Sequence, residues 1–352
     1  MHPQIGHFHQ DSGEQGLART IPEVEPSISG AVSELTLLPG TATPESRCIL
    51  CDAALEMDVA GLSDTRFGVP GSYEIHLCTR CGLEQTVPRP SISELKALYQ
   101  TYYNFGGETG TLYTRLREHF FFSVLNRLWS VLDGDVSFYQ RRGTGGLIDI
   151  GCNEGRGMPI YARNGFQVEG LELNETAAAV ARKSGFVVQT CLLSDFVPTQ
   201  PYKVAVLSNV LEHSLDPLEM LQDVHRILAD GGQVWISCPN SESWFRRVFG
   251  RSWINWHVPF HIVHFSAATL RRALEDAGYA QIEIRQITPA VWFAQSLIAY
   301  LFATKGKKNR QLRNPFLTLF IMLLARFVLF PVLWLANRCG RGDCLLTVAT
   351  KA

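Results

Sequence analysis

Hydrophobic positions follow two different periods in the second half of the chain. Between residues 146 and 287, short apolar runs such as LIDI and VWIS alternate with segments whose apolar residues recur every three or four positions. Short runs are typical of buried strands, and the longer period is typical of amphipathic helices. The alternation predicts an α/β fold with a doubly wound parallel sheet. We expect strands over 147–150, 167–173, 187–190, 202–209, 233–238 and 281–287, and helices over 157–164, 175–184, 217–228 and 267–277.

The rest of the chain has other patterns. Its first segment is rich in Pro, Ser, Gly, Glu and Thr without a sustained period, which predicts disorder. Further helices are expected over 91–99 and 112–132, and a linker over 141–146. The predicted organisation is a disordered tail (1–45), a cysteine module (46–90), a helical linker region (91–145), the core (146–287), an apolar helical insert (288–341) and a last strand (342–352).

A glycine-rich turn follows the first core strand, in the run LIDIGCNEGRG from Leu147 to Gly157. Such a turn places backbone N–H groups and a helix N-terminus at the carboxyl edge of the sheet, where nucleotides bind. Glu172 ends the next strand, 21 positions after Gly151. This spacing suits a carboxylate that accepts both ribose hydroxyls of a nucleoside cofactor. The alternative is a tight structural turn beside a solvated glutamate.

These residues resemble a known family. The run D-I-G-C-N-E-G resembles motif I of class I S-adenosylmethionine-dependent methyltransferases, and residues 207–240 and 261–279 are similar to blocks of the methyltransferase 23 branch. The resemblance implies S-adenosylmethionine as cofactor and a seven-stranded Rossmann-like sheet with an antiparallel last strand. It implies that Asp149, Gly151, Asn153 and Gly155 line the methionine and ribose side, that Glu172 binds the ribose diol, that Leu173 packs on adenine, and that Asn209 and Val210 face the methyl group.

The sequence departs from this family pattern at two positions. Asn153 replaces the middle glycine of the turn, although asparagine tolerates left-handed backbone better than most residues. No acid directly follows the third strand, so Asp195 is the candidate partner of the adenine amine from slightly further on.

Histidines are the candidate general bases. A hydroxyl that accepts a methyl group must lose its proton, and histidine suits this transfer near neutral pH. Our order of preference is His261, then His213, then His264, although each ring alone could equally fill a structural role. The tryptophan-rich run at 243–260 lies beside these residues. It is either an acceptor-binding lid or a helix that packs its aromatic side chains on the core.

Four cysteines in two C-x-x-C pairs predict a structural zinc site. Cys48 and Cys51 are separated from Cys78 and Cys81 by 26 residues, and two such pairs supply four thiolates for tetrahedral zinc. Four free thiols or two disulfides are the weaker alternatives. The module resembles the zinc-binding N-terminus of bacterial methyltransferases that are encoded together with sugar and cell-surface polysaccharide enzymes.

Two apolar segments flank a basic loop near the C-terminus. Residues 305–313 carry five positive charges between apolar runs at 291–303 and 316–336, and Arg326 interrupts the second run. An arginine at mid-bilayer disfavours a true span, so we expect shallow docking of 291–336 on an anionic membrane. A homodimer interface or a cap over the core is the alternative.

Composition narrows the functional class. The net charge of −1 gives no bias toward binding nucleic acid. The first residues lack the apolar core of a signal peptide, so we expect a cytoplasmic protein, located at the inner face of the membrane. The predicted function is methyl transfer to a hydroxyl of a sugar or lipid-linked glycan. C-methylation of a nucleotide sugar and a catalytically inactive binding protein are the alternatives.

Overall fold

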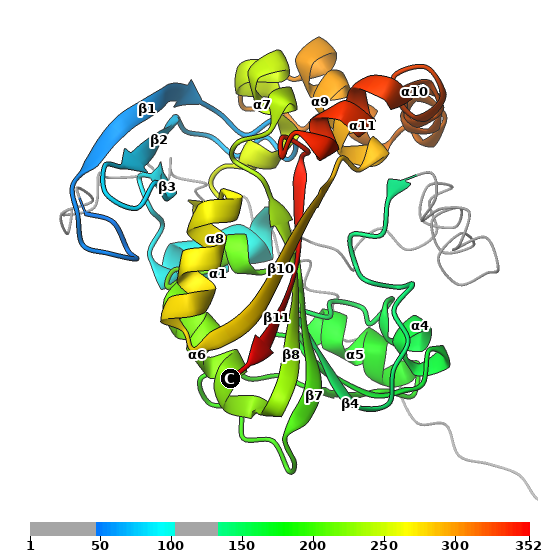
Figure 1. The fold of residues 1–352 in the computed structure, drawn as a ribbon. Helices are drawn as coiled ribbons and strands as arrows, with labels where there is room; N and C mark the ends of the chain where they lie inside the picture. The colour runs from blue at the N-terminus through cyan, green and yellow to red at the C-terminus, as the bar shows by residue number, and fades with distance from the viewer. Residues whose placement is uncertain (1–46, 103–132) are drawn as a thin grey trace, which may run out of the picture. The chain divides into compact units, whose positions relative to one another are not determined.

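The computed structural model describes residues 47–102 and 133–352, which belong to one compact unit. The predicted tail (1–45) and the predicted helix at 112–132 lie outside these residues. Figure 1 shows two sheets: a seven-stranded sheet in the core and a smaller sheet built from the cysteine module.

The larger sheet confirms the predicted fold class. Its strand order is β10-β11-β8-β7-β4-β5-β6, and β11 runs antiparallel to both of its neighbours while the other pairs are parallel. The strands are β4 (Gly145–Ile150), β5 (Phe166–Leu171), β6 (Val187–Gln189), β7 (Tyr202–Ser208), β8 (Leu228–Pro239), β10 (Tyr279–Ile287) and β11 (Cys344–Lys351). Because β4, β5 and β7 are parallel, their carboxyl ends lie at one edge of the sheet.

Apolar side chains alternate between the two faces of this sheet. In β7, Ala205 and Leu207 join one core cluster, whereas Val204 and Val206 join another, as the two-residue period of a strand requires. Helices α6 (Pro217–Ile227) and α8 (Ala267–Asp276) cover the first face, and α4 (Met158–Arg163) and α5 (Glu175–Lys183) cover the second (Figure 1). Both faces are therefore buried, which explains the near-continuous apolar runs of the central strands.

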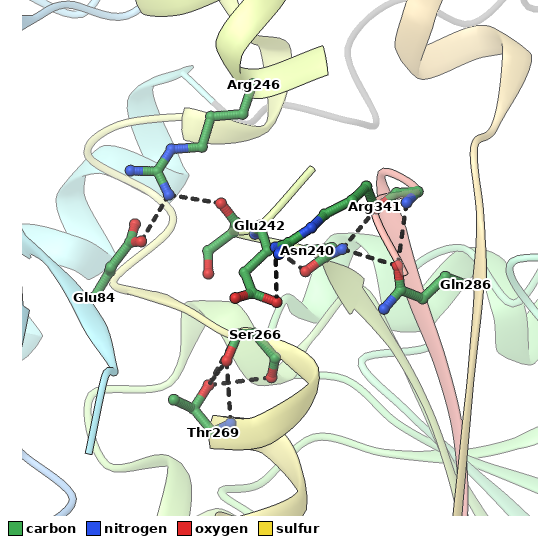
Figure 2. A network of polar contacts seen from close by, with 10 residues as sticks. Glu84, Asn240, Glu242, Arg246, Ser266, Thr269, Gln286 and Arg341 are labelled. Atoms are coloured by element: carbon green, nitrogen blue, oxygen red, sulfur yellow. Dashed lines mark hydrogen bonds and ion pairs between the residues drawn. The ribbon is translucent and has the colours of Figure 1, made fainter. Parts of the chain in front are cut away.

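Helix ends follow local capping chemistry. The Asp216 carboxylate accepts the Glu219 N–H at the start of α6, and Ser266 forms a capping box with Thr269 in α8 (Figure 2). Helix α1 (Ile92–Tyr102) begins where Ser91 and Glu94 exchange hydrogen bonds, as the sequence predicts. The largest boundary difference is at β8, which begins at Leu228, so Asp230-Gly231-Gly232 lies within a strand rather than ending a helix.

The cysteine module pairs with the core. Strands β1 (Leu55–Leu62), β2 (Tyr73–Cys78) and β3 (Glu84–Val87) form an antiparallel sheet whose fourth strand is β9 (Val263–His264). Glu84 and Gln85 pair with His264 and Val263, across almost 180 residues of sequence. The smaller sheet is thus completed by β9, a segment of the core predicted over residues 146–287.

A short helix connects the module to the sheet edge. Helix α7 (Trp244–Phe249) carries Arg246, whose guanidinium donates to Glu84 of β3 and to the Ser241 carbonyl at 2.6 Å each (Figure 2). The Arg246 guanidinium also lies 4.7 Å from the centre of the Trp256 ring.

Figure 2 also shows a contact between two strands of the larger sheet. The Asn240 side chain, directly after β8, donates a hydrogen bond to the Gln286 side chain of β10.

The apolar insert forms three helices above the carboxyl edge: α9 (Ala290–Phe302), α10 (Pro315–Phe327) and α11 (Phe330–Arg338). Their inner faces share a core cluster with Phe245, Phe249, Trp253 and Trp256. Among the described residues, no single helix is long and apolar enough to span a membrane. Helices α10 and α11 meet these two criteria only as a pair, and the axes of the two helices are bent by 69° where they join.

Candidate functional site

The glycine-rich turn between β4 and α4 has the backbone that its sequence requires. Gly151 and Gly155 both have a φ of +71°, and Asn153 adopts +53°. A Cβ on Gly151 would lie 2.8 Å from Val210 Cγ2, and one on Gly155 would lie 2.6 Å from Ala181 Cβ. Asparagine therefore preserves the left-handed turn at the middle position, whereas the two glycines are required by both conformation and close packing.

Glu172 connects two loops at the carboxyl edge. One carboxylate oxygen accepts the Asn153 N–H and the other accepts the Asn174 N–H, both at 2.8 Å. A carboxylate has about four acceptor positions, so each oxygen retains capacity for a ribose hydroxyl. The neighbouring Leu173 side chain is 64% exposed and offers an apolar surface beside this carboxylate.

Two further polar groups lie at the same edge. Asp149 is buried, and burial together with the nearby Glu172 charge raises the pKa of its carboxyl to about 7. Asn209 follows β7 with a φ of +56°, and its buried Oδ1 accepts no hydrogen bond from the described residues. An unsatisfied buried acceptor and a carboxyl with a raised pKa both fit a missing cationic, hydrogen-bonding ligand.

A histidine cluster includes Glu212 and His213, which closely follow Asn209 in the chain. We define it as His213, His257, His261 and His264 together with Glu212. The His213 and His261 ring centres are 4.7 Å apart, and those of His257 and His261 are 4.8 Å apart. Burial lowers the pKa of His213 to about 4 and that of His264 to about 3, and lowers the pKa of His261 well below its usual range. The rings are therefore neutral near pH 7.

Backbone carbonyls fix the tautomers of two of these rings. His213 Nδ1 lies 2.9 Å from the Phe260 carbonyl oxygen, and His261 Nδ1 lies 2.8 Å from that of Asn255. A carbonyl only accepts, so Nδ1 carries the hydrogen in each ring and Nε2 carries the lone pair. His213 is the least buried member of the cluster, and the Tyr99 hydroxyl of α1 also lies 2.9 Å from its Nδ1.

The sequence analysis identified His213, His261 and His264 but not the residues that contact them. Thr86 of the cysteine module donates its hydroxyl hydrogen to the His261 carbonyl oxygen at 2.6 Å and lies 3.0 Å from His264 Nε2. Glu212 is only 1% exposed. Desolvation by burial raises the pKa of the Glu212 carboxyl to about 8. Glu212 directly precedes the predicted base His213 in the sequence, whereas no sequence spacing linked Thr86 or Tyr99 to the histidines.

The four module cysteines converge. Cys48 Sγ lies 3.5 Å from Cys81 Sγ, Cys51 Sγ lies 3.5 Å from Cys78 Sγ, and all four sulfurs lie within 4.8 Å of one another. Sulfurs around a tetrahedral zinc ion lie about 3.8 Å apart, given Zn–S bonds of ~2.3 Å. The donor set and its spacing therefore fit structural zinc.

The tryptophan-rich run agrees with the packing alternative. Phe245, Phe249, Trp253 and Trp256 are buried against the apolar insert, and Arg246 pairs with Glu84 and Asp58. Its aromatic side chains are therefore not available as an open sugar-binding face.

Comparison with known proteins gives the family. The profile of the methyltransferase domain family matches residues 105–284, just over half of the chain. The chain belongs to this methyltransferase family. The matched range includes the glycine-rich turn, Glu172, Asn209 and the histidine cluster.

Curated relatives of this methyltransferase cover part of its length. A ubiquinone biosynthesis O-methyltransferase of Pseudomonas aeruginosa is 30% identical over 133 residues, which cover 34% of this chain and 57% of the relative. One from Proteus mirabilis is 27% identical over 180 residues, which cover 43% of this chain and 73% of the relative. A probable S-adenosylmethionine-dependent methyltransferase of Mycobacterium tuberculosis is 29% identical over 139 residues, 39% of this chain and 49% of that protein. The chain thus spans little more than half of the Pseudomonas relative.

Solved methyltransferase structures are also similar. A possible histamine N-methyltransferase of Thermotoga maritima has a TM-score of 0.43 at 18% identity, covering 68% of this chain and 97% of its own. An S-adenosylmethionine-dependent methyltransferase of Archaeoglobus fulgidus has a TM-score of 0.40 at 18% identity, covering 68% of this chain and all of its own.

The residues at the carboxyl edge fit S-adenosylmethionine, the cofactor of class I methyltransferases. The Glu172 carboxylate would hold the ribose hydroxyls, the exposed Leu173 would contact adenine, and Asp149 and Asn209 would meet the cationic methionine end. Asp195 is exposed in the turn after β6, and its contact with adenine stays a prediction.

Proposed function

We propose that this chain transfers a methyl group from S-adenosylmethionine to a hydroxyl of a sugar or lipid-linked glycan. One observation carries the proposal: within five residues after β7, the chain passes from Asn209 at the cofactor edge to Glu212 and His213 in the histidine cluster. A cofactor site and a group of neutral bases therefore adjoin at one edge of the sheet.

The residues have distinct tasks in this reaction. S-adenosylmethionine, when bound, supplies a methyl group activated by its sulfonium. The acceptor oxygen forms a bond to the methyl carbon as the carbon–sulfur bond breaks, and the pair of electrons from that bond stays on sulfur. The hydroxyl proton leaves to a base, and neutral histidine Nε2 atoms in the cluster are the candidate acceptors of that proton.

Among the predicted bases, His213 and His261 suit proton transfer better than His264. Carbonyl contacts leave Nε2 unprotonated in the first two rings. The Nε2 of His264 lies within hydrogen-bond distance of Thr86 Oγ1, beneath the Trp256 ring. We assign His264 a structural role within this proposal, as a support of the loop that carries His261.

Replacing His261 tests the role of the cluster. We expect His261→Ala to lower turnover by at least 100-fold, the lower range for loss of a general base, while the dissociation constant for S-adenosylmethionine stays within about threefold. Radiolabel transfer and calorimetry measure the two quantities. The matched control is His225→Ala, a histidine on α6 beside Tyr279. Turnover unchanged in His261→Ala would remove this residue from the mechanism.

The exposed side of the apolar insert supports a lipid-linked acceptor. Phe316, Phe320 and Phe327 of α10 are 70%, 65% and 76% exposed. Exposed lysines and arginines of the adjoining loop, at 305–313, would meet anionic headgroups. An enzyme held at a membrane would have access to an acceptor carried on a lipid.

Product analysis tests the acceptor class. Labelled S-adenosylmethionine is incubated with the protein and with separated lipid, glycan and nucleotide-sugar fractions, and the labelled product is hydrolysed. We expect an O-methyl ether on a sugar. A branched sugar would instead show C-methylation, and a labelled quinone-type lipid would favour the chemistry for which the ubiquinone-biosynthesis relatives are named. Absence of cofactor binding at millimolar concentration would favour a binding protein without catalysis.

A further inference from the structure

We propose that Glu212, His213 and His261 bind a divalent transition-metal ion at the sheet edge, separate from the four-cysteine site. One ligand atom from each of the three residues lies within 4.8 Å of the other two. His261 Nε2 and Glu212 Oε1 are 3.9 Å apart. Two imidazoles and one carboxylate form a donor set that binds zinc and related ions while leaving positions open for another ligand.

The Glu212 carboxylate has no other described function. Both of its oxygens are buried, and neither accepts a hydrogen bond from the described residues. Its backbone carbonyl is occupied, because it accepts the Ile262 N–H at 2.8 Å. Ionising such a carboxyl in a protein interior is costly unless a cation or a hydrogen-bond donor lies beside it. A cation beside it would compensate for that cost.

The two histidines have the environment that metal-bound imidazoles require. Metal-ligating histidines commonly donate their second ring N–H to a backbone carbonyl or a carboxylate, which fixes the tautomer and the ring plane. His213 and His261 both make this contact, with the carbonyl oxygens of Phe260 and Asn255. Each Nε2 thus carries a lone pair, and no proton has to be displaced from the ring.

Binding of an ion would break one existing hydrogen bond, between His257 and His261. His257 Nδ1 lies 3.3 Å from His261 Nε2, so the two rings share a hydrogen bond in the ion-free arrangement. Zinc bound to nitrogen and oxygen at ~2.1 Å draws tetrahedral ligands to about 3.4 Å from one another. The three side chains would therefore move closer together on binding, and His261 Nε2 would exchange a long hydrogen bond for a metal bond.

The link to catalysis rests on the proposed function, whereas ion binding itself does not. A divalent ion lowers the pKa of a hydroxyl that coordinates it. An ion at this position would therefore favour the ionised form of the proposed acceptor.

Metal content tests the proposal without any assay of activity. The cysteine site of the full chain is first filled with zinc, one further equivalent of Zn²⁺ is added, and native mass spectrometry counts the zinc ions that remain after desalting. We expect the wild type to carry one more zinc ion than Glu212→Gln and than His261→Asn. The control variant His225→Asn should match the wild type. Equal zinc counts in the wild type and in a folded Glu212→Gln would overturn the proposal.

Cobalt spectroscopy keeps the test decisive if these variants do not fold. Co²⁺ is added to wild-type protein whose cysteine site has been filled with zinc. Visible d–d bands without thiolate charge transfer indicate nitrogen and oxygen ligands and support the proposal. No bands, or bands with thiolate charge transfer, contradict it. Calorimetry with S-adenosylmethionine on the same sample reports separately on the proposed methyl-transfer function.

Discussion

Glu172 is held by the protein in the position where it would bind the cofactor. Its carboxylate holds the N–H groups of Asn153 and Asn174, one from each of the loops that border the cofactor edge. The side chain that would grip the ribose diol is thus already oriented before the cofactor arrives. This preorganisation reduces the entropy lost on binding.

Replacing Glu172 should weaken cofactor binding strongly. In Glu172→Gln, the amide NH₂ would face one of the two backbone donors and one charged acceptor would be lost. Hydrogen bonds to charged groups contribute about 1.5–3 kcal/mol, so we expect a roughly 10- to 150-fold higher dissociation constant for S-adenosylmethionine. Calorimetry measures it. Glu175→Gln, an exposed acid three residues away, is the matched control, and equal weakening in both variants would exclude a specific role for Glu172.

Asp149 should make cofactor binding depend on pH. Its carboxyl pKa of about 7 lies above the ordinary value of 3.8. Ionising it therefore opposes folding increasingly from about pH 4 to pH 7, and by a constant amount above that. A cationic cofactor prefers the ionised form, so affinity should rise with pH, by up to about tenfold between pH 6 and pH 8 for one titrating group. Asp149→Asn should flatten this profile, and a steep profile in that variant would assign the titration to another group.

The residues that could be predicted are those whose role depends on local sequence. The turn at 151–155, the acid at Glu172 and the paired cysteines follow from spacing, and the structure brings each group together. The supports of the histidines could not be found in this way. Tyr99 and Thr86 reach His213, His261 and His264 from segments more than 100 residues earlier in the chain.

At the scale of elements, periodicity predicted the core better than the connections. Every core strand and helix expected from the pattern is present, because both faces of the sheet are buried and the apolar period follows from that burial. The early start of β8 was not predictable. Asp-Gly-Gly is typical of turns, but here Gly231 has a φ of +70° within an irregular pairing of β7 and β8.

Removing zinc from the cysteine module should destabilise more than the module. The module packs on the core through the β3–β9 pairing and the Arg246–Glu84 contact. We expect Cys48→Ser combined with Cys78→Ser to lose one zinc ion and to lower the unfolding temperature by roughly 5 °C or more. Calorimetric melting and zinc analysis test this, with the half-buried Cys191→Ser outside the cluster as control. An unchanged zinc count would contradict the assignment.

At the scale of the whole molecule, the apolar insert has two different sides. The inner sides of α9, α10 and α11 complete a core cluster, as a cap would. Their outer sides expose many large apolar residues beside a basic loop. Large exposed apolar patches mark interaction sites, and the adjacent positive charge favours an anionic lipid surface over a second copy of this chain, which would present the same basic loop.

We predict that the protein sediments with anionic phospholipid vesicles and far less with neutral ones. Phe320→Ser combined with Phe327→Ser should reduce the bound fraction at least fivefold, because both rings lie on the exposed side of α10. A matched pair of exposed apolar residues outside the insert, Val187 and Val197 changed to Ser, should leave it unchanged. Equal recovery on both vesicle types, or a dimer that excludes vesicles, would contradict docking.

The strand pairing between β3 and β9 has a practical consequence for anyone who works with this chain. The sequence pattern suggests a domain boundary near residue 145, where the predicted core begins, and a truncated protein would naturally start there. A fragment made there would leave β9 with a bare edge and would strip Thr86 away from the loop that carries His261 and His264. The amino-terminal module therefore supports the loop that carries the proposed bases, and we expect a fragment without it to lose that support.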